Sequence, residues 1–357
     1  MHRRSALALF TALSLHCKAR MRIRIRAPYL IFLGDEPDRL HAKTGVGIAH
    51  WRPALCTGQY RLPGSGVDLG LPDMTPAEAK AAGAATMIWG VAGVGGTIPA
   101  HWVAPLFEAA AAGLDVCAGT HSSLSAVPGL ASAAKSIGVH LIDVRSPPAD
   151  LPVGTGAKRT GKRLLTVGTD CVVGKKFSAL SITQEMTARG WKADFRATGQ
   201  TGIMIAGGGI PIDAVVSDFV SGAAEVLSPD NAADHWDVIE GQGGLFHPGY
   251  AAVTLGLLHG SQPDAFVVCH EAGREYVAAF PDCLLPSIPH LIEHTIVCGS
   301  VTNAGIRCAG VCINASALQA EERDTCLRDL SELTGLPCVD PVATGVAPIV
   351  DYLDEHF

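Results

Sequence analysis

The sequence predicts an α/β fold of two domains, each built on a parallel sheet. Its 357 residues are more than one hydrophobic core usually organises. The composition is 48% hydrophobic and 17% charged with 40 glycines, which suits tightly packed layers better than disorder or a coiled coil. Short apolar runs alternate with helical segments along most of the chain, as expected of parallel strands joined by helical crossovers.

The first half of the chain predicts one such sheet, in a domain that we place at residues 21–150. Thr75 is positioned to cap a helix, and Glu78 completes a capping box with it. Gly138 ends a second helix before a strand. The expected strands are 29–33, 86–91, 114–118 and 139–144, and the expected helices are 41–51, 76–82, 100–112 and 129–137.

The second half repeats the alternation and predicts a further domain at residues 164–357. Residues 151–163 lie in a stretch rich in proline, glycine and basic side chains, which indicates a linker. The clearest helices are expected at 175–189 and 316–334. The expected strands are 164–168, 193–197, 238–240, 265–269, 308–313 and 338–340.

The first twenty residues imitate a secretory signal, because two arginines precede the mostly apolar run 6–15. Residues 16–20 offer no small-residue cleavage site, and Met21 begins a plausible strand. We therefore expect residues 1–20 to be a leader outside the fold, with Met21 the working start, and a true signal peptide is the alternative. No apolar run approaches the ~20 residues that span a bilayer.

Charge and cysteine content exclude several classes of partner. A net charge of −7 argues against a nucleic-acid binder, which needs a basic face, and nothing suggests a membrane partner. The eleven cysteines are scattered without a CxxC pair, so we expect a reduced, cytoplasmic setting and no metal. A homo-oligomer is expected from the base rate for soluble enzymes.

The segment LLTVGTDCVVGKKF, residues 164–177, predicts a loop that binds phosphate. It fits the GxxxxGK pattern between an apolar strand and a helix. The two glycines let backbone N–H groups turn inward, the helix adds its positive end, and the lysine adds a full charge. The expected phosphate-binding residues are Gly168, Thr169, Asp170, Cys171, Val172, Val173, Gly174 and Lys175.

Lys176 departs from the loop of nucleotide hydrolases, which have Ser or Thr there to ligate Mg²⁺. A charged lysine cannot ligate the metal, and it adds a second cation beside the phosphates. We include Lys176 among the cofactor-binding residues. The position favours a cofactor that is held by its phosphates without being cleaved, such as coenzyme A.

Polar side chains at the ends of two other expected strands are candidates for catalysis. Glu240 ends a strand before a glycine loop, where it would meet a metal or a reacting amine, unless it is only a solvated turn carboxylate. His270 would suit a general base because its ordinary pKa is near neutrality, although a single histidine there is often structural. His235 and His247 are weaker candidates.

Three residues are candidates for substrate binding and one for the cofactor. Arg196 would bind a substrate carboxylate bidentately or pair with Asp194 or Asp170. Gln200 lies in the same polar, glycine-rich loop, and Arg274 follows His270. Asn314 would read the edge of an adenine ring or cap the helix expected at 316–334.

The loop Gly90–Gly96, GVAGVGG, follows a strand and imitates a dinucleotide fingerprint. It lacks the register of GxGxxG and an acidic residue about 20 positions further on. We therefore expect a glycine-lined substrate or interdomain surface there, and not an NAD site.

Two resemblances follow from these motifs. GTDxxVGK with the strand-ending EGxGG resembles dethiobiotin synthetase and its relatives, over the second domain. From about Pro28 to Gly345 the chain is similar to the P-loop family, once of unknown function, of the D-glutamate N-acetyltransferase DgcN. The stretches that carry this resemblance include YLIFLGDEPDRLHAKTGVGIAHWRP, RLPGSGVDLGLPDMTPAEA and ADFRATGQTGIMIAGGGIPIDAVVSDFVSGAAE.

The closer resemblance implies a Rossmann-like first domain, a dethiobiotin synthetase-like second domain and an acetyltransferase of D-amino acid metabolism. Acetyl-CoA would donate its acetyl group to the amine of D-glutamate, with phosphates held by Gly168–Lys175. Two alternatives remain. One is an Mg-ATP-dependent ligase or kinase of the dethiobiotin synthetase type, and the other is a nucleotide-binding module without turnover.

Overall fold

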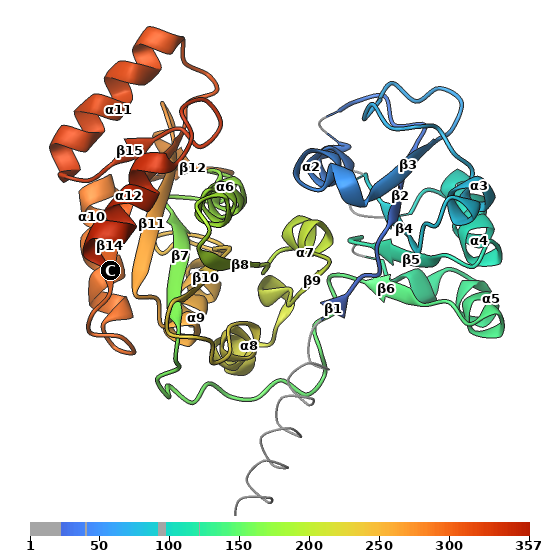
Figure 1. The fold of residues 1–357 in the computed structure, drawn as a ribbon, viewed down its shortest axis with the longest axis horizontal. Helices are drawn as coiled ribbons and strands as arrows, with labels where there is room; N and C mark the ends of the chain where they lie inside the picture. The colour runs from blue at the N-terminus through green and yellow to red at the C-terminus, as the bar shows by residue number, and fades with distance from the viewer. Residues whose placement is uncertain (1–22, 40, 92–97, 121) are drawn as a thin grey trace, which may run out of the picture. The chain divides into compact units, whose positions relative to one another are not determined.

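The computed structural model describes residues 23–39, 41–91, 98–120 and 122–357. The leader expected at 1–20 and most of the loop Gly90–Gly96 lie outside the described residues. By its internal contacts the chain forms two compact units (Figure 1). Unit 1 comprises Met1–Pro148 with Gln200–Ala214, and unit 2 comprises Ala149–Gly199 with Val215–Phe357.

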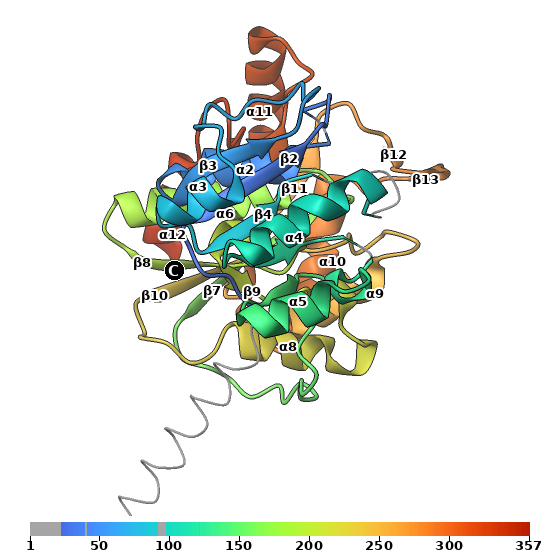
Figure 2. The same cartoon turned by 90° about the vertical axis from the view of Figure 1, so that its right-hand side faces the viewer.

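Unit 1 is built on a five-stranded parallel sheet of order β3-β2-β4-β5-β6. Helix α2 (Lys43–Trp51) lies on one face, and α3 (Pro76–Ala81), α4 (Val103–Ala111) and α5 (Leu130–Ile137) lie on the other (Figures 1 and 2). The strands are β2 (Tyr29–Gly34), β3 (Cys56–Arg61), β4 (Thr86–Trp89), β5 (Asp115–Ala118) and β6 (Leu141–Asp143).

The predicted capping box before α3 is confirmed. Thr75 accepts the amide of Glu78, and the Glu78 carboxylate accepts the amide of Thr75. One part of the expected helix 100–112 differs, because Ala100–Trp102 form a 3₁₀ turn ahead of α4. Pro105 lies inside the first turn of α4, where its missing N–H leaves no helical hydrogen bond unmade.

A segment from the second half of the chain completes unit 1. Helix α7 (Gln200–Ala206) packs against α2, and β9 (Gly208–Gly209) pairs antiparallel with β1 (Ile23–Arg24). The apolar residues of α7 are buried, which accounts for its attachment. Gln200, an expected substrate residue, therefore belongs to unit 1, and the alternation of strands and helices did not predict this.

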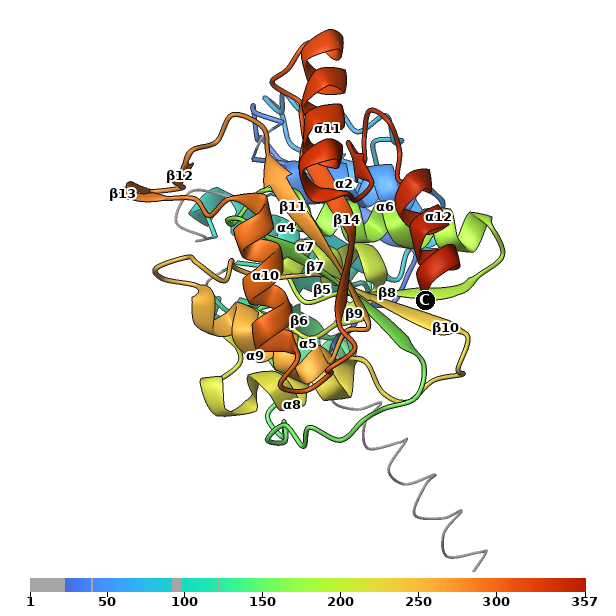
Figure 3. The same cartoon turned by 90° about the vertical axis from the view of Figure 1, so that its left-hand side faces the viewer.

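Unit 2 contains a six-stranded parallel sheet of order β15-β14-β11-β7-β10-β8, which confirms the second predicted sheet. Helices α6 (Lys175–Ala188) and α12 (Ala347–His356) cover one face, and α8 (Val220–Leu227), α9 (Ala251–Ser261) and α10 (Ile288–Gly299) cover the other (Figure 3). The strands are β7 (Lys162–Gly168), β8 (Lys192–Arg196), β10 (His235–Ile239), β11 (Ala265–Glu271), β14 (Arg307–Asn314) and β15 (Cys338–Val339).

Unit 2 departs from the predicted elements in two places. Helix α11 (Ala320–Thr334) begins four residues after the expected Ser316, because Gln319 and Glu322 form a capping box at its start. The short strands β12 (Tyr276–Val277) and β13 (Phe280–Leu284) form a hairpin that projects from unit 2 (Figures 2 and 3). This hairpin was not predicted.

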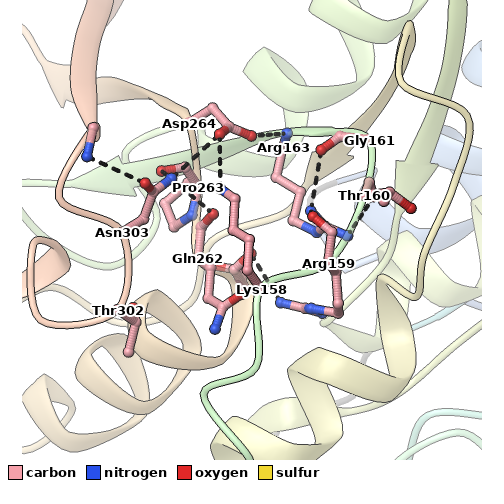
Figure 4. A network of polar contacts seen from close by, with 12 residues as sticks. Lys158, Arg159, Thr160, Gly161, Arg163, Gln262, Pro263, Asp264, Thr302 and Asn303 are labelled. Carbon is pink, nitrogen blue, oxygen red and sulfur yellow. Dashed lines mark hydrogen bonds and ion pairs between the residues drawn. The ribbon is translucent and has the colours of Figure 1, made fainter.

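Residues 149–161, within or beside the expected linker, contain no helix or strand but are tied to unit 2. The guanidinium of Arg159 is buried and donates to the carbonyls of Ser228, Gly260 and Ser261, at the ends of α8 and α9. Buried Arg163 donates to the hydroxyl of Ser228 and to carbonyls of the same segment (Figure 4). The segment is thus anchored by charged hydrogen bonds to helix ends.

Among the described residues, no helix combines the length and the apolar character that crossing a membrane requires.

Candidate functional site

The predicted phosphate loop connects β7 to α6 with the backbone that such a loop needs. Val172 and Gly174 have φ values of 60° and 106°, in the left-handed region, so the chain turns sharply before the helix. A Cβ at Gly168 would lie 2.8 Å from Val173 and 3.0 Å from Nζ of Lys175. Glycine is therefore required at Gly168 for the close approach of the lysine.

Lys175 is buried, and its ammonium lies inside the loop. Nζ donates to the carbonyl oxygens of Asp170, at 2.7 Å, and Gly243, at 2.8 Å. Burial lowers the pKa of Lys175, and nearby acidic groups, Glu240 among them, act in the opposite direction. The ammonium is held by neutral carbonyls, which a phosphate oxygen can replace with a stronger, charge-assisted bond.

The carboxylate of Asp170 is fully buried and organises the surroundings of the loop. It accepts the amides of Cys171 at 2.6 Å and Ala278 at 2.7 Å, and a guanidinium N–H of Arg274 at 3.0 Å. Arg274 also donates to the carbonyl of Cys171 and pairs with Glu271. Asp170 therefore joins the phosphate loop to the segment that contains β12.

His247 lies on the same aspartate, with Nε2 3.7 Å from a carboxylate oxygen of Asp170. Its Nδ1 accepts the amides of Gly249 at 3.0 Å and Tyr250 at 3.2 Å. The proton of the neutral ring is therefore on Nε2, facing the aspartate. His247 is buried and has no lone pair to offer as a base, so its position indicates a structural role beside the loop.

Cys171 lies between these groups, so a cysteine nucleophile has to be considered. Its sulfur and ligand atoms of Asp170 and His247 lie within 4.8 Å of one another. Burial raises the pKa of the Cys171 thiol, and the adjacent His247 cannot accept its proton at Nδ1. The geometry does not activate this thiol.

His270 lies beside the loop because β11 pairs with β7. In this pairing Cys269, the residue before His270, lies opposite Gly168, the first residue of the loop. Its Nδ1 lies 2.9 Å from the hydroxyl of Thr169. Burial lowers the pKa of His270, and the charge of Arg274 lowers it further, although Glu271 opposes this. The imidazole is therefore neutral at physiological pH, which a general base requires.

Glu240 follows β10, beside β7, and is buried. Its carboxylate accepts the amides of Thr198 and Gly199, both at 3.0 Å. The Thr198 hydroxyl donates to the carbonyl of Glu240 and accepts from the amide group of Gln242 at 3.0 Å. Glu240 is thus held by a network at the strand ends and is not the solvated turn carboxylate of the alternative interpretation.

The other candidates lie apart from this cluster or are already paired. Arg196 binds Asp194 at 3.1 Å, one of the two predicted aspartate partners, and also Asp237 at 2.8 Å, which was not predicted. Asn314 lies at the end of β14, and its side chain accepts the amide of Ser316 at 3.3 Å. It caps this turn and not α11, which begins later.

The structure therefore brings the phosphate loop, Glu240, His270 and Arg274 to the carboxyl ends of adjacent parallel strands, where ligands bind in open α/β sheets. Gln200 belongs to unit 1, whereas the residues of this cluster belong to unit 2. The roles of Thr198 and Gln242 were missed. The glycine-rich sequence around Gln242 indicated a loop at the strand end, but it did not indicate the hydrogen bonds among Glu240, Thr198 and Gln242.

Comparison with known proteins places the chain in a family. A model described as a domain of unknown function, DUF1611_C, P-loop domain, matches residues 152–350, and the DUF1611_N Rossmann-like domain matches residues 61–147. This chain belongs to the DUF1611 family. The predicted Rossmann-like and P-loop character of the two halves is thereby confirmed.

Individual known proteins resemble the chain over most of its length. It is 48% identical over 329 residues to a D-glutamate N-acetyltransferase of Tritonibacter scottomollicae, and 43% identical over 328 residues to one of Pseudoalteromonas sp. Each match covers 92% of this chain and 99% of the relative. A crystal structure of a DUF1611 family protein from Anabaena variabilis matches with a TM-score of 0.80 at 31% identity, covering 93% of this chain and 100% of the other.

Proposed function

We propose that this protein is a D-glutamate N-acetyltransferase that moves the acetyl group of acetyl-CoA to the amine of D-glutamate. Two relatives with that name, 48% and 43% identical over 92% of the chain, support the assignment. The observation that carries it within the molecule is the phosphate loop. This loop holds a buried lysine and is followed by Lys176, where a nucleotide hydrolase would have a hydroxyl.

The phosphates of acetyl-CoA bind at the loop in this proposal. Lys175 would exchange its two carbonyl partners for phosphate oxygens, and the N-terminal end of α6 would add backbone N–H groups. Lys176, beside the same helix end, supplies a second positive charge. Asn314 ends β14, the strand next to β11, and is our candidate contact for the adenine end of the cofactor. This binding needs no metal.

The chemistry requires a base because the amine of D-glutamate is an ammonium ion at neutral pH. His270 or Glu240 accepts that proton, and the free amine then attacks the thioester carbonyl carbon. The C–S bond breaks as the tetrahedral intermediate collapses, and the thiolate of coenzyme A takes up the proton that the new amide nitrogen releases. Neutral His270 is the stronger candidate because burial and Arg274 keep it unprotonated.

Recognition of the substrate carboxylates is assigned to arginine. Arg274 also pairs with Asp170 and Glu271 and would have to exchange one of them for the substrate, but it is 22% exposed at its side chain and lies beside the phosphate loop, so it is our first candidate. Arg196 is 15% exposed and engaged by two aspartates, one of them buried, so binding substrate would require it to leave an ion pair. Gln200 is retained as a candidate contact from unit 1. We also propose a cytoplasmic homo-oligomer.

The direct test incubates purified protein with acetyl-CoA and D-glutamate and measures N-acetylglutamate and free coenzyme A by chromatography. L-glutamate, other D-amino acids and EDTA-treated protein serve as controls. Equal amounts of both products, unaffected by EDTA, are expected. Formation of ADP from Mg-ATP without acetyl transfer would support the ligase or kinase alternative. Tight nucleotide binding without any product would support a module without turnover.

A further inference from the structure

We propose that His290, Glu293 and His294 on helix α10 form a binding site for a divalent transition-metal ion. The site is separate from the phosphate loop, and the proposal does not depend on the acetyltransferase assignment. One potential ligand atom from each of the three side chains lies within 4.8 Å of the others. All three belong to the first two turns of α10, which begins at Ile288.

Their spacing explains why the three side chains converge. Residues three and four apart lie on the same face of an α-helix, one turn above the other. The two histidines are four apart with the glutamate immediately before the second, which is the H-x-x-E-H pattern of helical zinc sites, where the two histidines bind the metal. The imidazole rings of His290 and His294 lie 4.1 Å apart between centroids, with their planes tilted by 53°.

The second histidine is prepared for a metal by its hydrogen bond. Nδ1 of His294 lies 3.0 Å from the backbone carbonyl oxygen of His290. A carbonyl only accepts, so Nδ1 carries the proton and the lone pair is on Nε2. This is the arrangement in which metal-bound histidines are commonly held, with one ring nitrogen donating to a backbone carbonyl and the other coordinating.

Packing limits the freedom of both rings. The Ser287 hydroxyl caps the helix by accepting the amide of His290, and Pro289 fixes the first turn. The ring of Phe246 packs on both imidazoles, at 5.0 Å from His290 and 5.3 Å from His294. Because the rings are already restricted, less side-chain conformational entropy is lost when a metal ion binds.

Charge and ligand type select the ion. The first turn of a helix is electropositive, which opposes a cation, and the carboxylate of Glu293 offsets this. Two imidazoles and one carboxylate suit Zn²⁺, Ni²⁺, Co²⁺ or Cu²⁺ better than Mg²⁺ or Ca²⁺, which prefer oxygen ligands. His290 and Glu293 are exposed, so water can fill the remaining coordination positions.

Two consecutive residues, Phe246 and His247, link the site to the phosphate loop through contacts on either side. Phe246, which packs on both imidazoles, precedes His247, which lies on Asp170 of the loop. A bound ion would hold the rings against Phe246 and restrict this segment. We therefore expect metal binding to slow amide hydrogen exchange in residues 245–250 as well as in α10.

The test titrates EDTA-stripped protein with Ni²⁺ by calorimetry, in wild type and in His290→Ala and His294→Ala. One tight site is expected in wild type, weakened more than ~10-fold in either variant, as loss of a ligand requires. The matched control is His356→Ala. His356 also places Nδ1 at 2.9 Å from the carbonyl four residues before it, Tyr352, but no second histidine lies there.

Folding is not at risk in these variants, because alanine favours helix and the replaced side chains are on the surface or half-buried. Unchanged Ni²⁺ affinity in both variants would overturn the proposal. The group Asp170, Cys171 and His247 also has metal-ligand geometry. Loss of the tight site in His247→Ala, with His290→Ala unaffected, would assign the ion to the phosphate loop and overturn it as well.

Discussion

The hydroxyl of Thr169 and Nδ1 of His270 are 2.9 Å apart, across neighbouring strands of one parallel sheet. A threonine hydroxyl can accept as well as donate. When Nδ1–H donates to Thr169, the lone pair of His270 is on Nε2, the tautomer that a general base at Nε2 needs. The direction of this hydrogen bond therefore decides which ring nitrogen of the candidate base carries the proton.

Thr169→Val removes this hydrogen bond while keeping the volume and branching of the side chain. We expect kcat to fall about 10-fold, similar to the loss of affinity or activity when a metal-bound histidine loses its hydrogen-bond partner. The KM for acetyl-CoA should change little, because the backbone of the loop is retained. Steady-state kinetics with both substrates checks this, and Thr183→Val at a half-buried position of α6 is the control. A change confined to KM would contradict the proposed positioning role.

The pH dependence follows from the lowered pKa of His270. The base acts when neutral, so kcat/KM should rise with pH through a value below the ordinary 6.5 and be level above it. The same shift makes the unfolded state bind more protons between the two pKa values, so stability also rises with pH in that window. His270→Gln should remove the acid limb, measured as kcat/KM from pH 4.5 to 8. If the fall in kcat/KM at low pH is unchanged in His270→Gln, the general base is Glu240 instead.

Glu240→Gln separates charge from structure at the second candidate base. The glutamine oxygen can still accept the amides of Thr198 and Gly199, so the fold should be retained. If Glu240 removes the ammonium proton, kcat should fall by roughly 10²–10⁴. If it only orders the loop, kcat should fall less than about 10-fold. Circular dichroism establishes folding, and single-turnover kinetics measures the acetyl-transfer step.

Lys175→Met tests the phosphate loop itself. Methionine has similar length and no charge, so binding of acetyl-CoA should weaken by at least ~100-fold, while Lys192→Ala on the surface of unit 2 should bind normally. Thermal shift with saturating acetyl-CoA measures this, because a ligand at a hundred times its Kd adds about 2.7 kcal/mol of stability. Equal shifts in wild type and Lys175→Met would place the cofactor elsewhere.

Arg159→Ala should destabilise the protein without touching the candidate site. The change leaves carbonyls at the ends of α8 and α9 buried without their donor. We expect a loss of about 2–4 kcal/mol, as for other buried hydrogen-bonded charges that lose a partner. Urea denaturation measures it. The control is Arg328→Ala, which removes an exposed ion pair with Asp329 and should change the free energy of unfolding by less than about 0.5 kcal/mol.

The sequence predicted those parts of the molecule that depend on local pattern. The alternation of strands and helices predicted most strands of both sheets, although it missed β3, and the GxxxxGK spacing predicted the loop, because each is set by neighbouring residues. The burial of Asp170 by Arg274 and Ala278 depends on contacts across more than a hundred residues. No metal was expected from the sequence because the cysteines are scattered, and His290 and His294 of α10 were therefore not considered as ligands. Helix α7 looked like any other crossover helix.

The placement of α7 and β9 in unit 1 has a consequence for synthesis. The chain enters unit 2 at Ala149, returns to unit 1 for Gln200–Ala214, and then leaves again. A ribosome that has released only the first 150 residues has therefore not supplied the partner of β1, and the apolar face of α2 lacks α7. The first unit cannot mature until part of the second has emerged, so the nascent chain must keep an unfinished surface exposed to chaperones for about sixty further codons.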